Sequence, residues 1–393
     1  MADTSAAELR VEPRVSAIDA AAWDACATPA AATHNPFVSH AFLKCLEDAG
    51  CVGGRSGWLP QHLVVADPAG GLAACMPAYV KSHSQGEYVF DHGWAEAYGR
   101  AGGHYYPKLQ VAVPFSPVPG PRLLVKPGPG AAEAALLLGA GAVELSRRLG
   151  LSSVHVTFCR EAEWDQLSEL GYLKRTDQQF HWLNQGYATF DAFLASLSSR
   201  KRKTIRKERA QALSAELEII QLTGTDITEA HWDAFFAFYM DTGNRKWGRP
   251  YLNRKFFSLL GGAMADRCLL ILAVRDRQPI AGALNLIGGD CLYGRYWGAS
   301  EQHPCLHFEV CYYQAIDYAI AHKLARVEAG AQGEHKLARG YLPAATFSAH
   351  WIADPGLRRA VSRYLDEERR AVAEHREMLA EYGPYRKVVE EQD

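Results

Sequence analysis

Segments with strand character alternate with helical segments along the whole chain, and one order of elements occurs twice. The first half is expected to form strands at 61–66, 72–80, 87–91, 121–125 and 152–158, with a helix at 131–149. The second half is expected to form strands at 179–183, 217–221, 268–275, 279–286, 292–297 and 326–329, with helices at 190–197, 200–213, 228–242, 252–264, 308–322 and 356–382. This alternation predicts mixed α/β layers and argues against an all-α or all-β fold.

The length of the chain supports a division into two domains. A chain of 393 residues exceeds the size at which a single hydrophobic core usually stops growing. The two series of elements meet at 174–177, so we predict domains at 1–174 and 175–393. The second domain then carries a basic helix near its start and a charged amphipathic helix at its end.

Composition indicates an ordinary globular protein. Hydrophobic residues make up 48% and charged residues 22%, and the formal net charge is -2. That charge gives no reason to expect a DNA-coating protein, so any basic site must be local. The start of the sequence lacks the pattern of a signal peptide, and the longest apolar stretch, 131–143, is too short to cross a bilayer. We therefore expect a cytoplasmic protein without membrane insertion, whose nine scattered cysteines are reduced thiols.

The most charged segment of the chain is the helix expected from residue 200. Seven of the ten residues from Arg200 to Arg209 are basic, and Lys203 and Lys207 share one helical face. Like charges three and four positions apart repel one another, whereas a merely solvated helix mixes signs. A polyanion would relieve this repulsion, and the phosphates of CoA, a phosphate-bearing acceptor and RNA all qualify. The alternative is a solvated helix face.

A dense group of glycines and polar side chains follows the expected strand 326–329. Its members are Gly330, Gln332, Gly333, Glu334, His335, Lys336 and Arg339. Ligand sites often lie at the carboxyl ends of strands in α/β proteins, and the glycines allow close approach to a ligand. Glu334 or His335 suits the removal of a proton from an attacking amine. Lys336 and Arg339 suit binding of phosphate or carboxylate groups or polarisation of a carbonyl, and we expect Lys336 to be exposed.

Two further groups of residues carry polar chemistry. His303, Cys305 and His307 alternate, but Pro304 and the helix that follows favour a polar helix start over a zinc site, so no metal is expected. We place His307 and Glu309 in the same cavity as the glycine-rich segment. In the first half, Asp91, Trp94, Lys108, Gln110 and Arg122 are interpreted as the wall of a cleft, with ordinary core packing as the alternative.

Several of these stretches together resemble a bacterial family of Fem-like N-acyltransferases of the GNAT superfamily. Among them is Gly294-Arg-Tyr-Trp-Gly-Ala, and the full set lies at 35–43, 88–95, 105–110, 114–124, 294–299, 306–314 and 330–343. The sequence lacks two features of such relatives. One is the long coiled-coil insertion of the peptidoglycan-bridge Fem proteins, and the other is a clean Arg/Gln-x-x-Gly-x-Gly/Ala loop, the usual signature for the pyrophosphate of acyl-CoA. The resemblance covers most of the chain and implies an α/β fold with two tandem GNAT-like acetyltransferase domains.

The resemblance also implies a reaction. An acyl group would move from an acyl-CoA thioester to the amine of a small-molecule or peptide-like acceptor, without a covalent enzyme intermediate. Catalysis is assigned to Glu334, His335, Lys336, His307 and Glu309. Substrate binding is assigned to ten further residues: Gly330, Gln332, Gly333, Arg339, Lys203, Lys207, Asp91, Trp94, Lys108 and Arg122. Two alternatives stay open: an aminoacyl-tRNA-dependent transferase, in which the basic helix holds RNA, and a non-catalytic ligand-binding protein on an acyltransferase scaffold.

Overall fold

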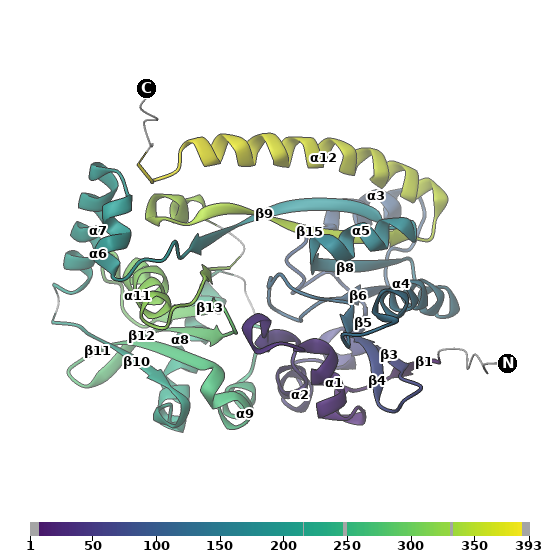
Figure 1. Ribbon diagram of the computed structural model, residues 1–393, viewed down its shortest axis with the longest axis horizontal. Helices are drawn as coiled ribbons and strands as arrows, with labels where there is room; N and C mark the ends of the chain where they lie inside the picture. The colour runs from purple at the N-terminus through teal and green to yellow at the C-terminus, as the bar shows by residue number, and fades with distance from the viewer. Residues whose placement is uncertain (1–7, 215, 247–249, 331–332, 387–393) are drawn as a thin grey trace. The chain divides into compact units, whose positions relative to one another are not determined.

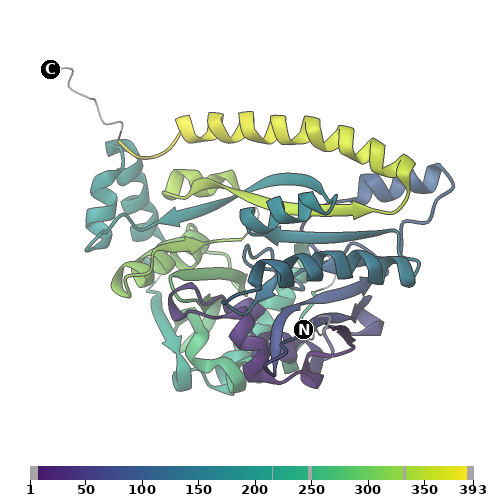
Figure 2. The ribbon, with the colours of Figure 1, turned by 45° about the vertical axis from the view of Figure 1, so that its right-hand side comes forward.

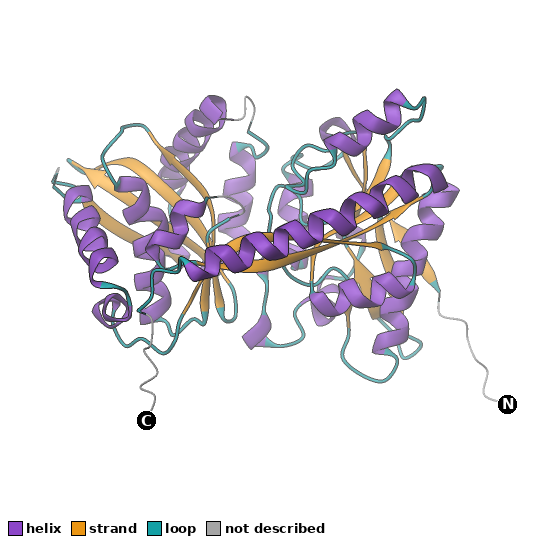
Figure 3. Cartoon of the chain, turned by 90° about the horizontal axis from the view of Figure 1, so that it is seen from above, coloured by secondary structure: helices purple, strands orange, loops and turns teal. Residues whose placement is uncertain are grey.

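The computed structural model describes residues 8–214, 216–246, 250–330 and 333–386, which form two compact units (Figure 1). The first unit comprises the described residues up to Asp177 together with Ala345–Ala373. The second comprises Gln178–Ala344 and the described residues from Glu374 onward. The domain bounds expected from the sequence, 1–174 and 175–393, stay a prediction. In both units, helices flank the strands (Figure 3).

The described part of the first unit contains two sheets. One has the strand order β15-β8-β6-β5-β2, in which β6 and β8 are parallel. Its strands are β2 (Trp58–Pro60), β5 (Ala78–Lys81), β6 (Lys108–Val111), β8 (Ser153–Cys159) and β15 (Leu342–Ile352). The other is antiparallel, in the order β1 (Leu9–Glu12), β3 (His62–Ala66), β4 (Leu72–Met76) and β7 (Leu124–Val125).

Helix α4 (Ala131–Arg148) covers the core of the first unit. It lies against β3, β4 and β8 (Figure 2) and buries the small and apolar face that includes Leu138 and Ala142. These residues share a core with Leu63 and Val154. The other helices here are α1 (Ala20–Ala27), α2 (His40–Asp48), α3 (His92–Arg100), α5 (Glu161–Glu169) and most of α12 (Pro355–Glu381).

The strand expected at 87–91 is wrong. These residues form a loop in which Tyr88 adopts a left-handed backbone conformation, with a φ of 61°. Glu87 and Asp91 turn their carboxylates to Lys108, and both are buried. In a strand these two residues would share a face but lie about 13 Å apart along the chain, whereas ion pairing brings both carboxylates to one amine.

Six neighbouring strands of a sheet lie wholly or partly in the described residues of the second unit. The order is β10-β11-β12-β13-β14-β9, and the pair β13–β14 is parallel. The strands are β9 (Leu173–Leu183), β10 (Glu218–Thr223), β11 (Cys268–Arg275), β12 (Gln278–Ile287), β13 (Cys291–Ala299) and β14 (Arg326–Glu328). The helices are α6 (Phe190–Ser196), α7 (Ser199–Ala212), α8 (Glu229–Lys246), α9 (Arg254–Met264), α10 (Leu306–Phe308) and α11 (Gln314–Ala321).

Helix α10 runs into a π-helical turn, η7 (Glu309–Tyr313), before α11 begins, so the helix expected at 308–322 is present with an extra residue wound into it. Short 3-10 turns complete the chain: η1 (Val15–Ala17), η2 (Ala31–Thr33), η3 (Pro36–Val38), η4 (Gly54–Ser56), η5 (Gly224–Asp226), η6 (Ala265–Arg267) and η8 (Glu334–Arg339). Among the described residues, every helix is too short or too polar to span a membrane.

Candidate functional site

Strands β13 and β14 part shortly after they meet. Strand β12 pairs with β13 along nearly its whole length, from Ile287 opposite Leu292 to Ala281 opposite Ala299. Strand β14 pairs with β13 only from Cys291 to Tyr293. Beyond this point the side of β13 that faced β14 is open to side chains of the helices that follow. The parting of two parallel strands is therefore where a ligand can reach the sheet.

A β-bulge lies at the same place. Leu284 is opposite Tyr296 and Asn285 is opposite Gly294, so Arg295 is the extra residue of β13. Bulges re-aim side chains and are common beside active sites. Arg295 turns to Glu328, with 3.0 Å between Nη2 and Oε2, and both side chains are buried. Burial alone would raise the pKa of Glu328, but the charges of His181, Arg295 and Arg326 hold it below its usual value.

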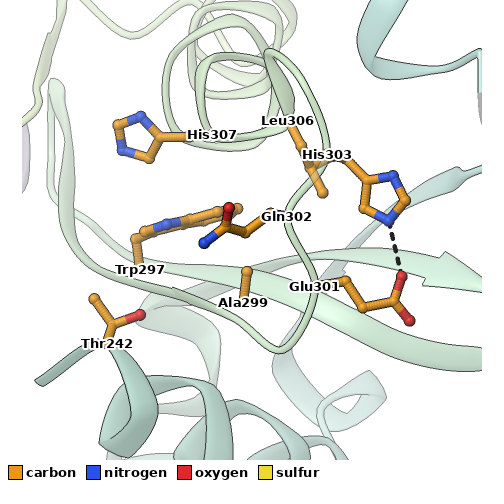
Figure 4. A pocket seen from close by; sticks show the side chains of 8 residues that line it. All are labelled: Thr242, Trp297, Ala299, Glu301, Gln302, His303, Leu306 and His307. Atoms are coloured by element: carbon orange, nitrogen blue, oxygen red, sulfur yellow. Dashed lines mark hydrogen bonds and ion pairs between the residues drawn. The ribbon is translucent and has the colours of Figure 1, made fainter. Parts of the chain in front are cut away.

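Two pockets open beside this stretch of β13. The large pocket has a volume of about 370 Å³ and is lined by Thr242, Trp297, Ala299, Glu301, Gln302, His303, Leu306 and His307 (Figure 4). The small pocket has a volume of about 110 Å³ and is lined by Ala283, Asn285, Gly294, Arg295, Tyr296, Trp297, His307, Cys311, Tyr312 and Ala329. Trp297 and His307 line both, with their ring centroids 5.2 Å apart. The two volumes therefore share one wall.

The large pocket has a polar rim. Glu301 accepts a hydrogen bond from Arg275 at 2.6 Å, and its other oxygen lies 2.8 Å from His303 Nε2 (Figure 4). His303 thus pairs with the carboxylate of Glu301. Among the residues that the structure describes, no group of three or more His, Cys, Asp and Glu side chains is arranged to hold a metal ion.

The glycine-rich segment after β14 contributes Lys336 and His335 to the edge of the small pocket. The Lys336 ammonium donates to the carbonyl of Gly330 at 3.0 Å, next to the pocket residue Ala329. The expectation that Lys336 is exposed is wrong, because its residue is 2% exposed. Burial, with the nearby charge of Arg295, lowers the pKa of Lys336 to about 7. His335 Nε2 lies 2.9 Å from the hydroxyl of Tyr312.

Other residues of the same segment point elsewhere. The Glu334 side chain is 68% exposed and lies 3.6 Å from His375. Arg339 forms two hydrogen bonds to Glu208 of α7 and stacks on Phe308. Gly330 and Gly333 both adopt positive φ, as a sharp loop requires. Gln332 lies outside the described residues.

His307 and Glu309 are separated by the start of the π-turn. His307 lines both pockets, whereas Glu309 is fully buried and turned toward α7. There it receives two hydrogen bonds from Arg209, at 2.9 and 3.1 Å. A π-turn shifts the following side chains around the helix axis and is frequent at functional sites. Here it begins two residues after His307 and contains Tyr312.

The basic helix α7 packs against this region. Arg206 pairs with Asp191, and Arg209 pairs with Glu309 and Asp317. Lys203 and Lys207 are exposed, and among the described residues neither has an ion pair. Gln211, one turn further along their face, contacts the thiol of Cys305 at 3.6 Å. Burial raises the pKa of the Cys305 thiol, and the charge of Lys207 opposes that shift. Cys305 directly precedes Leu306, which lines the large pocket.

The residues expected to form a cleft wall in the first unit are buried. Lys108 donates to Ser84 at 2.9 Å and to Glu87 at 2.7 Å, and it also contacts Asp91. Trp94 packs its ring against those of His155 and His350. Arg122 donates to the backbone carbonyls of 118, 120, 121 and 157. The structure brings Asp91 and Lys108 together and gives Arg122 a separate environment, while both pockets belong to the second unit.

Sequence reasoning missed Trp297, Tyr312, Arg295 and Asn285 as residues of the site. Trp297 and Arg295 stand in the stretch that carries the family resemblance, and glycine inside a strand is a signal for a bulge or a close approach. Gly294 is such a glycine, because a Cβ there would lie 3.1 Å from Asn285 Oδ1. Tyr312 also stands in such a stretch, 306–314, but the direction of its side chain depends on the π-turn.

Comparison with known proteins agrees with this architecture. The structure of FemX is similar over 88% of this chain and 98% of that chain, with a TM-score of 0.55 and 12% identity. L-PGS from Bacillus licheniformis is similar over 85% and 98%, with a TM-score of 0.50 and 9% identity. The C-terminal domain of a putative lysylphosphatidylglycerol synthetase from Agrobacterium fabrum is similar over 87% and 95%, with a TM-score of 0.52 and 8% identity.

These likenesses show the fold, and the predicted mixed α/β class is confirmed. No curated protein matches the chain in a sequence search. The profile of the FemAB-like family, described as peptidoglycan biosynthesis/recognition, matches residues 14–387. Because this match spans nearly the whole sequence, the chain belongs to the FemAB-like family.

Proposed function

We propose that this protein is an N-acyltransferase that moves an acyl group from an acyl-CoA thioester to the amine of a small-molecule or peptide-like acceptor. The buried Lys336 beside the small pocket carries this proposal. An amine that is hidden from water, has a pKa of about 7 and lies at the parting of two parallel strands is suited to proton transfer at neutral pH.

The reaction would need one proton acceptor and one oxyanion donor. The acceptor nitrogen attacks the acyl carbon, a C–N bond forms, and the C–S bond breaks to release the thiolate. Neutral Lys336 would take the proton of the attacking amine. Tyr312 lines the small pocket and lies 2.9 Å from His335, so its hydroxyl is held in place to donate toward the oxyanion of the tetrahedral intermediate.

The large pocket is the proposed entrance for the acyl carrier. It adjoins the small pocket through Trp297 and His307. Its lining residue Leu306 follows Cys305, whose thiol contacts Gln211 on the face of α7 that carries Lys203 and Lys207. A cationic row beside a pocket attracts a carrier with phosphate groups. Glu301 is held by Arg275 and His303, so the carboxylate at the rim is compensated.

A transfer assay tests this proposal. Acetyl-CoA and propionyl-CoA are offered with a panel of primary amines and amine-bearing peptides, and release of free CoA thiol is followed. We expect amine-dependent release by the wild type and a loss of roughly a hundredfold or more in Lys336→Met. Release by the Lys336→Met variant at the wild-type rate would contradict the role of this lysine. Binding of CoA thioesters without turnover for any amine would favour a non-catalytic protein.

A second candidate is transfer of an aminoacyl group from tRNA. It is favoured by the number of cations on α7: Arg200, Lys201, Arg202, Lys203 and Lys207 form no ion pair among the described residues. CoA has few phosphates, whereas tRNA offers a long run of them. Aminoacyl-tRNA labelled on the amino acid should then transfer its label to an amine, and binding should weaken steeply with salt. Label transfer without any use of acyl-CoA would replace the first proposal with this one.

A further inference from the structure

Asn285 is a buried polar residue with an unused acceptor. It lies in β12, its residue is 1% exposed, and its Nδ2 donates to the carbonyl of Leu269 at 3.4 Å. Among the described residues, Oδ1 has no hydrogen-bond partner. The opposite rotation of the carboxamide would bring Oδ1 against the Leu269 carbonyl, and two acceptors repel. The orientation with Nδ2 toward Leu269 is therefore favoured, and in it Oδ1 points away from the Leu269 carbonyl.

That other side is the small pocket. Gly294 is directly opposite Asn285 on β13, and a Cβ at this glycine would lie 3.1 Å from Oδ1. The glycine therefore keeps space open in front of the oxygen. The neighbouring polar groups of the pocket already have partners, because Arg295 is paired with Glu328 and Tyr312 with His335. In the described part of the chain, Asn285 Oδ1 is therefore the acceptor of this pocket that has no hydrogen-bond partner.

The chemistry of an amide oxygen selects its ligand. A buried acceptor left unsatisfied costs about 1–3 kcal/mol, so a donor group that enters the pocket gains from the contact. A thioester or ester carbonyl cannot supply that donor, since it is itself an acceptor. An amine can, and the carboxamide does not remove a proton, so the amine stays a nucleophile or a recognition group.

We propose that Asn285 Oδ1 accepts a hydrogen bond from an amine group of the substrate in the small pocket and thereby sets specificity for that group. This inference rests on the proposed function, which brings an amine to the same place. The amine has two sources: the attacking nitrogen of the acceptor, or an amino group carried on the transferred acyl group. Asn285 is a positioning residue in both cases.

Small probes test the contact without any turnover. Glycine methyl ester and methyl propionate have nearly the same size, and they differ by an amino group in place of a methyl group. Saturation-transfer NMR on the wild-type chain should show glycine methyl ester binding roughly tenfold more tightly than methyl propionate. In Asn285→Leu this preference should fall to within about twofold, and in Asn285→Asp, which keeps an acceptor, it should persist.

A matched control is available in the first unit. Gln110 also has a buried carboxamide oxygen without a partner among the described residues, but it lines neither pocket. Gln110→Leu should leave the preference for glycine methyl ester unchanged. Equal binding of the two esters to the wild type overturns the inference. A preference that survives in Asn285→Leu overturns it as well. If the leucine variant does not fold, loss of the preference in Asn285→Asp, which keeps an acceptor, overturns the inference instead.

Turnover then separates the two sources of the amine. With glycyl-CoA and propionyl-CoA as donors, an amine on the acyl group predicts a roughly tenfold preference for glycyl in kcat/KM that Asn285→Leu abolishes. An attacking amine predicts that Asn285→Leu raises the KM of the acceptor about equally with both donors. Transfer without any effect of Asn285 overturns only this inference. Probe binding that depends on Asn285, with no transfer from any donor, overturns only the proposed function.

Discussion

Lys336 is an amine in surroundings that work against its charge. Its residue is 2% exposed, and among the described residues its ammonium has one acceptor, the carbonyl of Gly330. Burial and Arg295 lower its pKa to about 7. The side chain thus reduces the stability of the folded protein while it is suited to proton transfer, and this combination is common where a site is built for chemistry.

Replacing Lys336 by Met should separate activity from stability. The unfolded state binds more protons at this position between pH 7 and the ordinary lysine pKa of 10.5, so the contribution of Lys336 to stability rises with pH in that window. Lys336→Met should therefore be more stable than the wild type, by on the order of a few kcal/mol below pH 7. The gain should shrink as the pH rises toward 10.5.

Chemical denaturation at a series of pH values measures this difference, with kcat measured in parallel for the folded protein. Lys255, an exposed lysine at the start of α9, provides a control, since Lys255→Met should leave kcat unchanged. A Lys336→Met variant that loses stability at every pH would show that the lysine is held by stronger partners than Gly330.

At the scale of elements, the sequence indicated regular segments well and missed the irregular ones. Strand β11 begins and ends where its apolar run does, at Cys268 and Arg275. Strand β15 was not predicted, because Pro343 near its start argues against a strand and its side chains do not alternate cleanly. The loop at 87–91 was predicted as a strand. Its conformation depends on ion pairs to Lys108, about twenty residues away, and the local sequence does not reveal them.

The candidate site was only partly predictable for the same reason. His307, His335 and Lys336 were expected from their density of polar chemistry, and they lie at or beside the pockets. The surroundings of Asn285 depend on a bulge, and the direction of the Tyr312 side chain depends on a π-turn. Each of these features adds one residue to its element and so re-aims the neighbouring side chains. A pattern of residue types does not reveal such a shift, because it leaves the overall period of the strand or helix nearly intact.

Helix α7 gives a prediction at the element scale. Neutralising Lys203 and Lys207 together with Gln should weaken binding of an acyl-CoA or tRNA by roughly tenfold at low salt and lower the salt slope for RNA by about one unit per lysine. Fluorescence anisotropy over a salt series measures both effects. Arg359→Gln with Arg363→Gln on α12 is the matched control, an exposed basic pair one turn apart. If the two double variants change affinity and salt dependence equally, the lysine face of α7 is only solvated.

The π-turn gives a second prediction. Glu309 is fully buried and holds Arg209, so Glu309→Ala should lower the free energy of unfolding by about 3 kcal/mol, because a buried charge loses its partner. Asp317→Ala removes the other carboxylate on Arg209, which is 32% exposed, and should cost under about 1 kcal/mol. Denaturant titration compares them. If Glu309→Ala keeps full stability and loses turnover, Glu309 has the catalytic role that the sequence suggested.

At the scale of the whole molecule, the first unit is assembled from two distant parts of the chain. Residues up to 177 provide most of its strands and helices, and 345–373 provide part of β15 and most of α12. Strand β15 pairs with β8 from Phe347 to Ile352, and Ala349 belongs to the core beneath α4. A sequence prediction that cuts the chain once, at 174, has no means of finding this return, because the pairing partners are almost two hundred residues apart.

The return of the chain makes a prediction about fragments. A fragment of residues 1–177 would expose the edge of β8 and the apolar surface that Ile352 and Leu365 bury, so it should not fold stably alone. The same fragment joined by a flexible Gly/Ser linker to 345–373 restores both contacts and should fold. Far-UV circular dichroism and resistance to proteolysis compare the two at equal concentration. Replacing Leu365 by Asp in the joined fragment is the control, since a charge in this buried position should undo the rescue. A cooperative unfolding transition in 1–177 alone, as sharp as that of the joined fragment, would show that the first unit does not need its second segment.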